Sequence, residues 1–308
     1  MKLTMGSSPH IRTPQRSGDL MGHVMLALLP ALAVGVWQLG ASALWVALVC
    51  TFTSVVTEWL CRGGKMAPDG SAAVTGLLLA MTLPPSLPLW LAALGGAFAV
   101  AVGKMLWGGL GQNVFNPALV ARAAMLLCFP RAMTDYHSAD VTSHATPLHR
   151  MALHDLPHEN LLDLFLGLCG GSVGEVSALA LLLGGGYLLW RRVISWRIPV
   201  AYLATVAVLT LMLFRGDAPI LWMASQLCSG GLVLGAIFLA TDYATSPVTP
   251  RGRLLYGVGC GALTVLFRYT GIFPEGVTYA ILLMNALTWV IDRATPPRRF
   301  GAEKGAKV

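Results

Sequence analysis

The sequence predicts an all-α integral membrane protein of about ten transmembrane helices. Hydrophobic residues make up 56% of the 308 residues and charged residues only 11%, against roughly 25% charged in soluble globular proteins. A soluble fold of this composition would lack the polar surface to cover its core, so a lipid bilayer is the natural solvent. Apolar runs separated by short basic clusters indicate the same fold class.

Ten apolar segments follow one another along the chain. A full span needs about 20 apolar residues, and the third and fifth segments are shorter. Pro or Gly bounds both, which predicts short, interrupted helices that are buried or line a cavity. The segments cover residues 22–39, 42–60, 71–83, 89–107, 116–130, 173–190, 198–214, 220–240, 254–270 and 276–292.

The segments divide into two halves of five. Segment three, from Ser71, and segment eight, from Ser229, share a pattern of small and apolar residues. Because five is odd, the second half would have the opposite orientation, as in an inverted repeat; chance similarity is the alternative. We expect an N-terminal segment (1–21), a first half (22–130), a polar loop (131–172), a second half (173–292) and a C-terminal tail (293–308).

Basic residues predict the orientation in the membrane. With the N-terminus in the cytoplasm, the cytoplasmic segments hold 16 of the 21 Lys and Arg residues, and the outer loops hold 4. Such an excess is typical of cytoplasmic loops. We therefore expect both termini in the cytoplasm of a bacterial cell and the 131–172 loop on the outer side of the inner membrane. The first 20 residues do not resemble a cleaved signal peptide.

Four motifs give the chain a resemblance to the RnfD/NqrB family of ion-translocating oxidoreductase subunits. The resemblance covers nearly the whole chain, and the absence of a long N-terminal extension makes it more similar to the RnfD branch. The motifs are Asp-Gly-Ser-Ala-Ala-Val-Thr-Gly from Asp69, Gly-Gly-Leu-Gly-Gln-Asn-Val-Phe-Asn-Pro from Gly108, Ala-Thr-Asp-Tyr-Ala-Thr-Ser-Pro from Ala240 and Pro-Glu-Gly-Val-Thr-Tyr from Pro274.

The resemblance implies a covalent FMN in the outer loop. In the family, FMN is attached through its phosphate to a threonine, and the matching residue is Thr146, preceded by Ser143 and Ala145. His144 stands where the NqrB-like motif has glycine. Taken alone, this run is only a polar turn, since the following proline restricts Thr146 to an extended or turn shape.

The resemblance also implies a non-covalent riboflavin near a pair of asparagines, which match Asn113 and Asn116. These two lie on one face if the turn between them is helical, and their amides suit the polar edge of a flavin ring. Alternatively, Asn116 caps the following helix, with Pro117 in its first turn. Arg122, inside segment five, could stabilise a reduced flavin or pair with a carboxylate.

Two carboxylates, Asp242 and Glu58, are candidates for an ion path, with snorkelling at the membrane interface as the alternative. No catalytic residue is expected. The six cysteines contain no C-x-x-C pair and the seven histidines have no clear zinc spacing, so no metal site is expected either.

As a whole, the resemblance implies a flavin-carrying subunit of an Rnf-type complex. Such a complex moves electrons between ferredoxin and NAD and translocates Na⁺ or H⁺. The chain has no NAD or iron–sulfur motif, so it would depend on partner subunits, including iron–sulfur subunits and a periplasmic FMN subunit. No nucleic-acid partner is expected. Interrupted helices and an inverted repeat also fit a secondary transporter or channel without redox activity.

Overall fold

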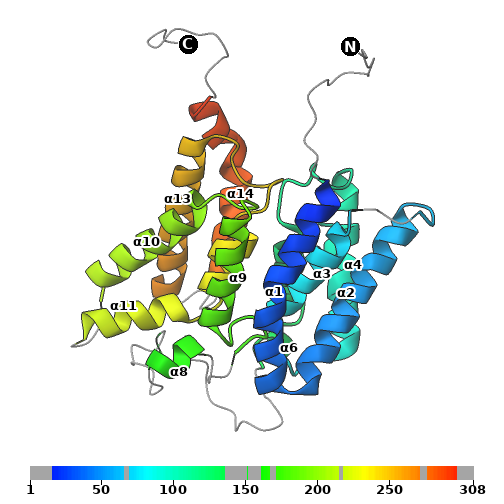
Figure 1. The fold of residues 1–308 in the computed structure, drawn as a ribbon, viewed down its shortest axis with the longest axis horizontal. Coiled ribbons are helices and arrows are strands. Elements are labelled where there is room, and N and C mark those ends of the chain that lie inside the picture. Colours follow the sequence, from blue (N-terminus) through cyan, green and yellow to red (C-terminus); the bar gives the residue numbers. More distant parts are fainter. Residues whose placement is uncertain are drawn as a thin grey trace, which may run out of the picture.

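The computed structural model describes residues 16–65, 69–135, 151, 161–166, 171–214, 218–270 and 276–296, and every regular element within them is helical (Figure 1). Three of these helices are long and apolar enough to cross a membrane, or four if one bent pair forms a single span. Four further apolar helices have 10–17 residues. The fold class is as predicted, while the count of ten spans stays a prediction.

The first half contains two long helices followed by shorter ones. The predicted short segments three and five are confirmed as helices of 11 and 12 residues. Segment four is helical only in its first part and ends in turns. The elements are α1 (Ser17–Leu39), α2 (Ala41–Cys61), α3 (Ser71–Met81), α4 (Leu89–Ala101), the 3-10 turn η1 (Met105–Trp107), α5 (Pro117–Cys128) and α6 (Pro130–Met133).

The second half corrects the predicted segment 220–240, which is not one continuous helix. Gly230 and Gly231 adopt positive φ angles of 68° and 61°, and the helices on either side are bent by 62°. The elements of this half are α9 (Ala178–Trp190), α10 (Arg197–Met212), α11 (Pro219–Cys228), α12 (Leu232–Leu234), the π-helical turn η2 (Gly235–Leu239), α13 (Pro250–Thr270) and α14 (Val277–Ala294). The short helix α8 (Leu161–Leu166) lies in the 131–172 loop before them.

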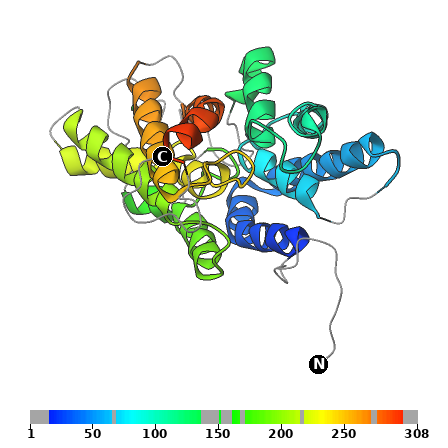
Figure 2. The same ribbon diagram turned by 90° about the horizontal axis from the view of Figure 1, so that it is seen from above.

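The two halves lie side by side and are built alike (Figure 2). In the first, α2 packs against α3 and α4, and α4 packs against α5. In the second, α10 packs against η2 and α13, and α13 packs against α14. Contacts of α1 with α9 and of α5 with α14 join the halves. This matched packing supports the inverted repeat predicted from two short segments.

Equivalent details repeat within each half. Glycines allow close helix packing: a Cβ at Gly96 in α4 would lie 2.6 Å from the Cys50 carbonyl oxygen of α2, and one at Gly257 in α13 would lie 2.9 Å from the Ile198 carbonyl oxygen of α10. The third helix of each half also begins after a left-handed glycine, with φ 64° at Gly70 and 61° at Gly231. Only glycine adopts this conformation without steric cost.

The outer surface of the helices is apolar. Trp37, Trp190 and Leu106 are 79%, 78% and 74% exposed, respectively. Soluble monomers rarely expose apolar patches larger than a few hundred Å², whereas lipid-facing helices do so throughout. The surface therefore agrees with a multi-pass membrane protein.

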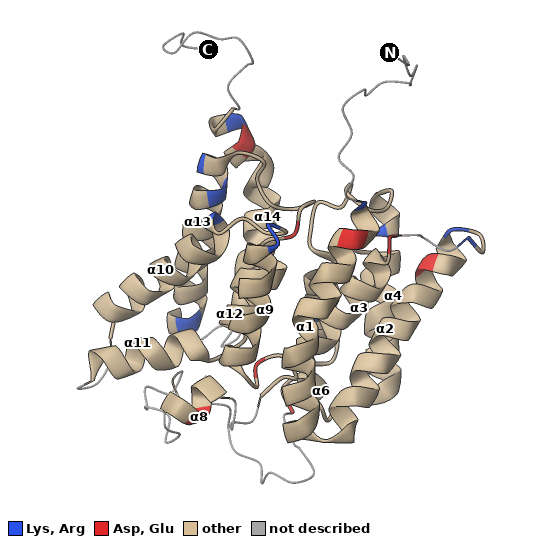
Figure 3. Ribbon diagram, viewed as in Figure 1, with Lys and Arg blue, Asp and Glu red and all other residues tan. Residues whose placement is uncertain are grey.

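Charges gather at one end of the molecule. Most of the Lys and Arg positions marked on the ribbon lie at the end where α1 begins and α14 ends (Figure 3). We call this end the termini side and the other the far side. Arg268 lies in the last turn of α13. The asymmetry agrees with the charge pattern in the sequence, and the assignment of the termini side to the cytoplasm remains a prediction.

Candidate functional site

A cavity of about 80 Å³ lies between the two halves, toward the termini side. Its walls are mostly apolar, and a few polar groups from distant parts of the chain converge on it. We call it the termini-side cavity. The residues that line it are Met21, Val24, Ser71, Val74, Thr75, Leu78, Lys104, Leu110, Asn113, Asn116, Pro117, Leu188, Ile194, Phe238, Thr241, Asp242 and Tyr243.

Asn113 and Asn116 both line this cavity, although the residues between them form bends and not the helical turn that would have placed them on one face. Asn116 is buried and caps α5, with its side-chain oxygen accepting from the amide nitrogens of Ala118 at 3.0 Å and Leu119 at 3.4 Å. Its amide nitrogen donates to the Leu239 carbonyl of η2 at 3.1 Å. The capping interpretation is therefore confirmed, and the same side chain also joins the two halves.

Asp242 also lines the cavity, from the loop that follows η2. Its carboxylate accepts from Thr245 at 3.4 Å and interacts with the Asn113 amide. Burial raises the pKa of Asp242 above its usual value, and these hydrogen bonds partly oppose the shift. Asp242, predicted on an ion path, and Asn113, predicted to bind flavin, thus meet in one place.

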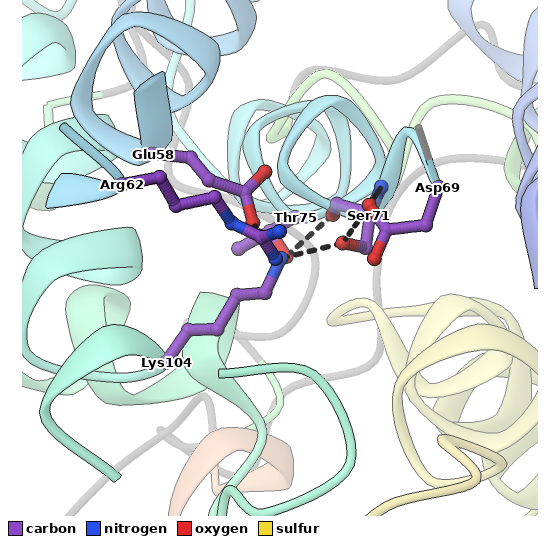
Figure 4. Close-up of polar contacts among 6 residues, drawn as sticks. All are labelled: Glu58, Arg62, Asp69, Ser71, Thr75 and Lys104. Carbon is purple, nitrogen blue, oxygen red and sulfur yellow. Dashed lines mark hydrogen bonds and ion pairs between the residues drawn. The ribbon is translucent and has the colours of Figure 1, made fainter. Parts of the chain in front are cut away.

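Lys104 joins the site without having been predicted as a site residue. It is 2% exposed and lines the cavity, and its ammonium donates to Glu58 Oε1 at 2.8 Å and to the Ser71 hydroxyl (Figure 4). Glu58 also pairs with Arg62 at 3.1 Å. The signal in the sequence was a single basic residue inside an apolar run, which is costly in a membrane unless it is paired.

Glu58 is buried at 4% exposure and does not line the cavity itself. The snorkelling alternative for Glu58 is therefore wrong, because its carboxylate points into the protein, where Lys104 satisfies it. Glu58 reaches the cavity through that partner.

Arg122 lies elsewhere, in a second cavity of about 20 Å³. Its guanidinium donates to the Thr82 carbonyl at the end of α3. Ser172, Glu175 and the Gly230–Gly231 break complete the polar part of this cavity. The structure therefore separates Arg122 from Asn113 and Asn116, although the three lie within ten residues of one another in the sequence.

The two cavities occupy equivalent places in the inverted repeat. The termini-side cavity lies where α3 and α5 begin and η2 ends. The second, which we call the far-side cavity, lies where α12 and α14 begin and α3 ends. Helix ends at membrane depth can hold polar ligands, because their backbone groups are not all used within the helix.

Three predicted site residues, Thr146, Ser143 and Ala145, lie outside the described residues. Within the described ranges, no group of three or more His, Cys, Asp or Glu residues could hold a metal ion.

Comparison with known proteins places these features in a family. The sequence pattern of the NQR2, RnfD, RnfE family matches residues 4–301. The chain belongs to this family. Full-length relatives agree: the chain is 45% identical to the D subunit of the Na(+)-translocating ferredoxin:NAD(+) oxidoreductase complex of Acetobacterium woodii, over 99% of the chain and 97% of the relative.

Two further relatives in the family differ in the ion they are named for. The chain is 42% identical to the D subunit of the proton-translocating ferredoxin:NAD(+) oxidoreductase complex of Clostridium ljungdahlii, over 98% of the chain and 97% of the relative. It is 41% identical to the D subunit of the ion-translocating oxidoreductase complex of Stutzerimonas stutzeri, over 94% of the chain and 93% of the relative.

Proposed function

We propose that this chain is the D subunit of an Rnf-type complex, a membrane subunit that carries flavin while the complex couples electron transfer between ferredoxin and NAD to ion translocation. The observation that carries the proposal is end-to-end similarity to subunits named for that activity. The relatives are named for Na⁺ in one case and protons in another, so the proposal does not specify the coupling ion. The chain is not catalytic alone and works with iron–sulfur and flavin-bearing partner subunits.

The termini-side cavity is the proposed site of the non-covalent riboflavin. Val74, Leu78 and Phe238 give it apolar walls, and Asn113 and Asn116 place amide groups in its lining. A flavin ring likewise combines an apolar dimethylbenzene part with a polar part of carbonyls and ring nitrogens. The flavin would supply the electron-carrying chemistry, and the chain would fix its orientation and its electrostatic surroundings.

Thr146 is the proposed attachment point of the second flavin, FMN, through a phosphoester. The 131–172 loop joins the far-side ends of the two halves, and α6, which opens it, follows α5 directly. With both termini in the cytoplasm, this flavin would lie on the outer side of the inner membrane. Arg122 in the far-side cavity would then provide positive charge on the same side of the membrane.

The attachment is tested by separating the full-length chain on a denaturing gel and measuring flavin fluorescence. The expected result is a fluorescent band that Thr146→Ala abolishes and that the matched loop variant Thr142→Ala retains. Equal fluorescence from the Thr146→Ala band and the unsubstituted chain would refute the covalent site. Mass spectrometry of the peptide that contains residue 146 should show an added mass equal to that of FMN less one water.

A secondary transporter or channel is the second candidate. The break at Gly230–Gly231 and the two equivalent cavities favour it, since broken helices in inverted repeats form the substrate sites of many transporters. Colour separates the two functions. Purified protein with flavin absorbance supports the redox function, whereas colourless protein that moves a solute by itself supports the transporter.

A further inference from the structure

Lys104 places a positive charge on the wall of the termini-side cavity. Its side chain is almost fully buried, and two contacts fix the ammonium: Glu58 Oε1 at 2.8 Å and the hydroxyl of Ser71. Ser71 is held in turn by Asp69, whose carboxylate accepts from its hydroxyl at 2.9 Å (Figure 4). The ammonium therefore has little freedom to move away from the cavity.

The other charges of this cluster stand behind Lys104. Glu58, Arg62 and Asp69 do not line the cavity, whereas Lys104 does. Coulomb energy falls with distance and is larger in a poorly solvated interior than in water. A ligand in the cavity would therefore experience Lys104 more strongly than the carboxylates that neutralise it. Among the described residues, the other charged group that lines the cavity is Asp242, whose carboxylate is engaged by the side chain of Asn113.

We propose that Lys104 is a positioning residue that sets the reduction potential of the flavin in this cavity, by favouring the reduced anion over the neutral oxidised ring. This inference rests on the proposed function of the cavity. On full reduction the oxidised ring takes up two electrons and one proton, and so gains one negative charge. A fixed ammonium lowers the free energy of that charged form, while Glu58 behind it moderates the effect.

The test uses the full-length chain carrying Thr146→Ala, so that the added riboflavin is its single flavin. Dithionite supplies the electrons, solvent supplies the proton, and absorbance against reference dyes gives the midpoint potential. The variants are Lys104→Gln, Lys104→Arg, Glu58→Gln and Arg62→Gln. Arg62→Gln is the matched control, because it also removes a cation bound to Glu58 but lies outside the cavity and is partly exposed.

Lys104→Gln is expected to disfavour the reduced flavin relative to the oxidised flavin at least tenfold. For a two-electron couple, this lowers the midpoint potential by about 30 mV. Lys104→Arg should keep most of the original potential, and Arg62→Gln should change it little. Glu58→Gln should shift the potential in the opposite direction, because it removes the negative charge that offsets Lys104. A structural role alone would not produce shifts of opposite sign.

Three outcomes overturn the inference, and they can be told apart. If the Thr146→Ala chain binds no riboflavin, the proposed function of the cavity fails and Lys104 loses its role with it. If riboflavin binds and Lys104→Gln leaves the potential unchanged, the role of Lys104 alone is refuted. If Lys104→Gln does not fold, Glu58→Gln decides, and an unchanged or lowered potential in that variant also refutes the inference.

Discussion

Asn116 offers the sharpest test of how the two halves are joined. Its side-chain oxygen caps α5, and its side-chain nitrogen bonds to the Leu239 carbonyl in the other half. Losing an asparagine cap costs about 1 kcal/mol, and leaving the buried carbonyl without its donor costs about 1 kcal/mol more. Asn116→Ala should therefore destabilise the protein by about 2 kcal/mol, roughly 30-fold in the unfolding equilibrium.

Asn116→Ser separates the two contributions without burying a charge. Serine caps helices as well as asparagine does, but its short side chain has no amide hydrogen for the Leu239 carbonyl, so about half of the loss is expected. Ser177→Ala is the matched control. Ser177 caps α9 through the Ala180 amide at 3.2 Å, and it should show the capping loss of about 1 kcal/mol alone.

The measurement is denaturant unfolding in detergent, followed by tryptophan fluorescence. The expected order of stability is the unsubstituted chain, then Asn116→Ser and Ser177→Ala together, then Asn116→Ala. Asn116→Ser as stable as the unsubstituted chain would show that the bond to Leu239 contributes nothing to joining the halves. If Asn116→Ala were within a few tenths of a kcal/mol of the unsubstituted chain in stability, both contributions would be refuted.

Individual contacts elsewhere in the molecule lead to three more predictions. Gly76→Ala should destabilise the protein by about 1–3 kcal/mol, because the new Cβ would lie 2.7 Å from Thr51 Cα. Gly22→Ala is the control and should be neutral or stabilising, because a Cβ there would have nothing within 4 Å. Equal melting temperatures for the two variants would contradict the close packing of α3 on α2. Tyr256→Phe should lower the free energy of unfolding by about 1–3 kcal/mol, because it removes the 2.5 Å hydrogen bond from the Tyr256 hydroxyl to buried Asn285. An unchanged unfolding midpoint would count against that contact. If Asp242 binds the coupling cation, its raised pKa means that protons compete at a higher pH than for an exposed aspartate. The Na⁺ concentration for half-maximal turnover should then rise as the pH falls toward that pKa. Asp242→Asn should remove this pH dependence. If the variant and the unsubstituted chain showed the same pH dependence, Asp242 would be excluded as the cation site.

Much of the architecture could be predicted from hydropathy and spacing. The low charge content and the apolar runs determine that the chain must be surrounded by lipid, and Pro and Gly at segment ends predict the short helices α3 and α5. The Asn-x-x-Asn spacing before Pro117 would place two amides on one face of a helical turn. The residues between the two asparagines form bends instead, and both asparagines line the cavity through the packing of the two halves. The similarity of two short segments was enough to suggest the inverted repeat.

Other features depend on contacts between distant parts of the chain. Lys104 and Glu58 are 46 residues apart, and Asn116 and Leu239 are 123 apart. Hydropathy can show that a buried charge needs a partner, but not which carboxylate supplies it. The sequence also grouped Arg122 with Asn113 and Asn116, which the structure assigns to different cavities because α5 carries Arg122 away from the helix start where the asparagines lie.

The sequence by itself determined that this is a helical membrane protein of the RnfD type, with polar residues at the ends of short helices. Only the tertiary structure decided that those ends meet in two equivalent cavities, one toward the termini side and one toward the far side, and that Lys104 lines the cavity with the asparagines. The physical reason is that local patterns specify which segments enter the membrane, whereas the pairing of buried polar groups depends on how those segments pack.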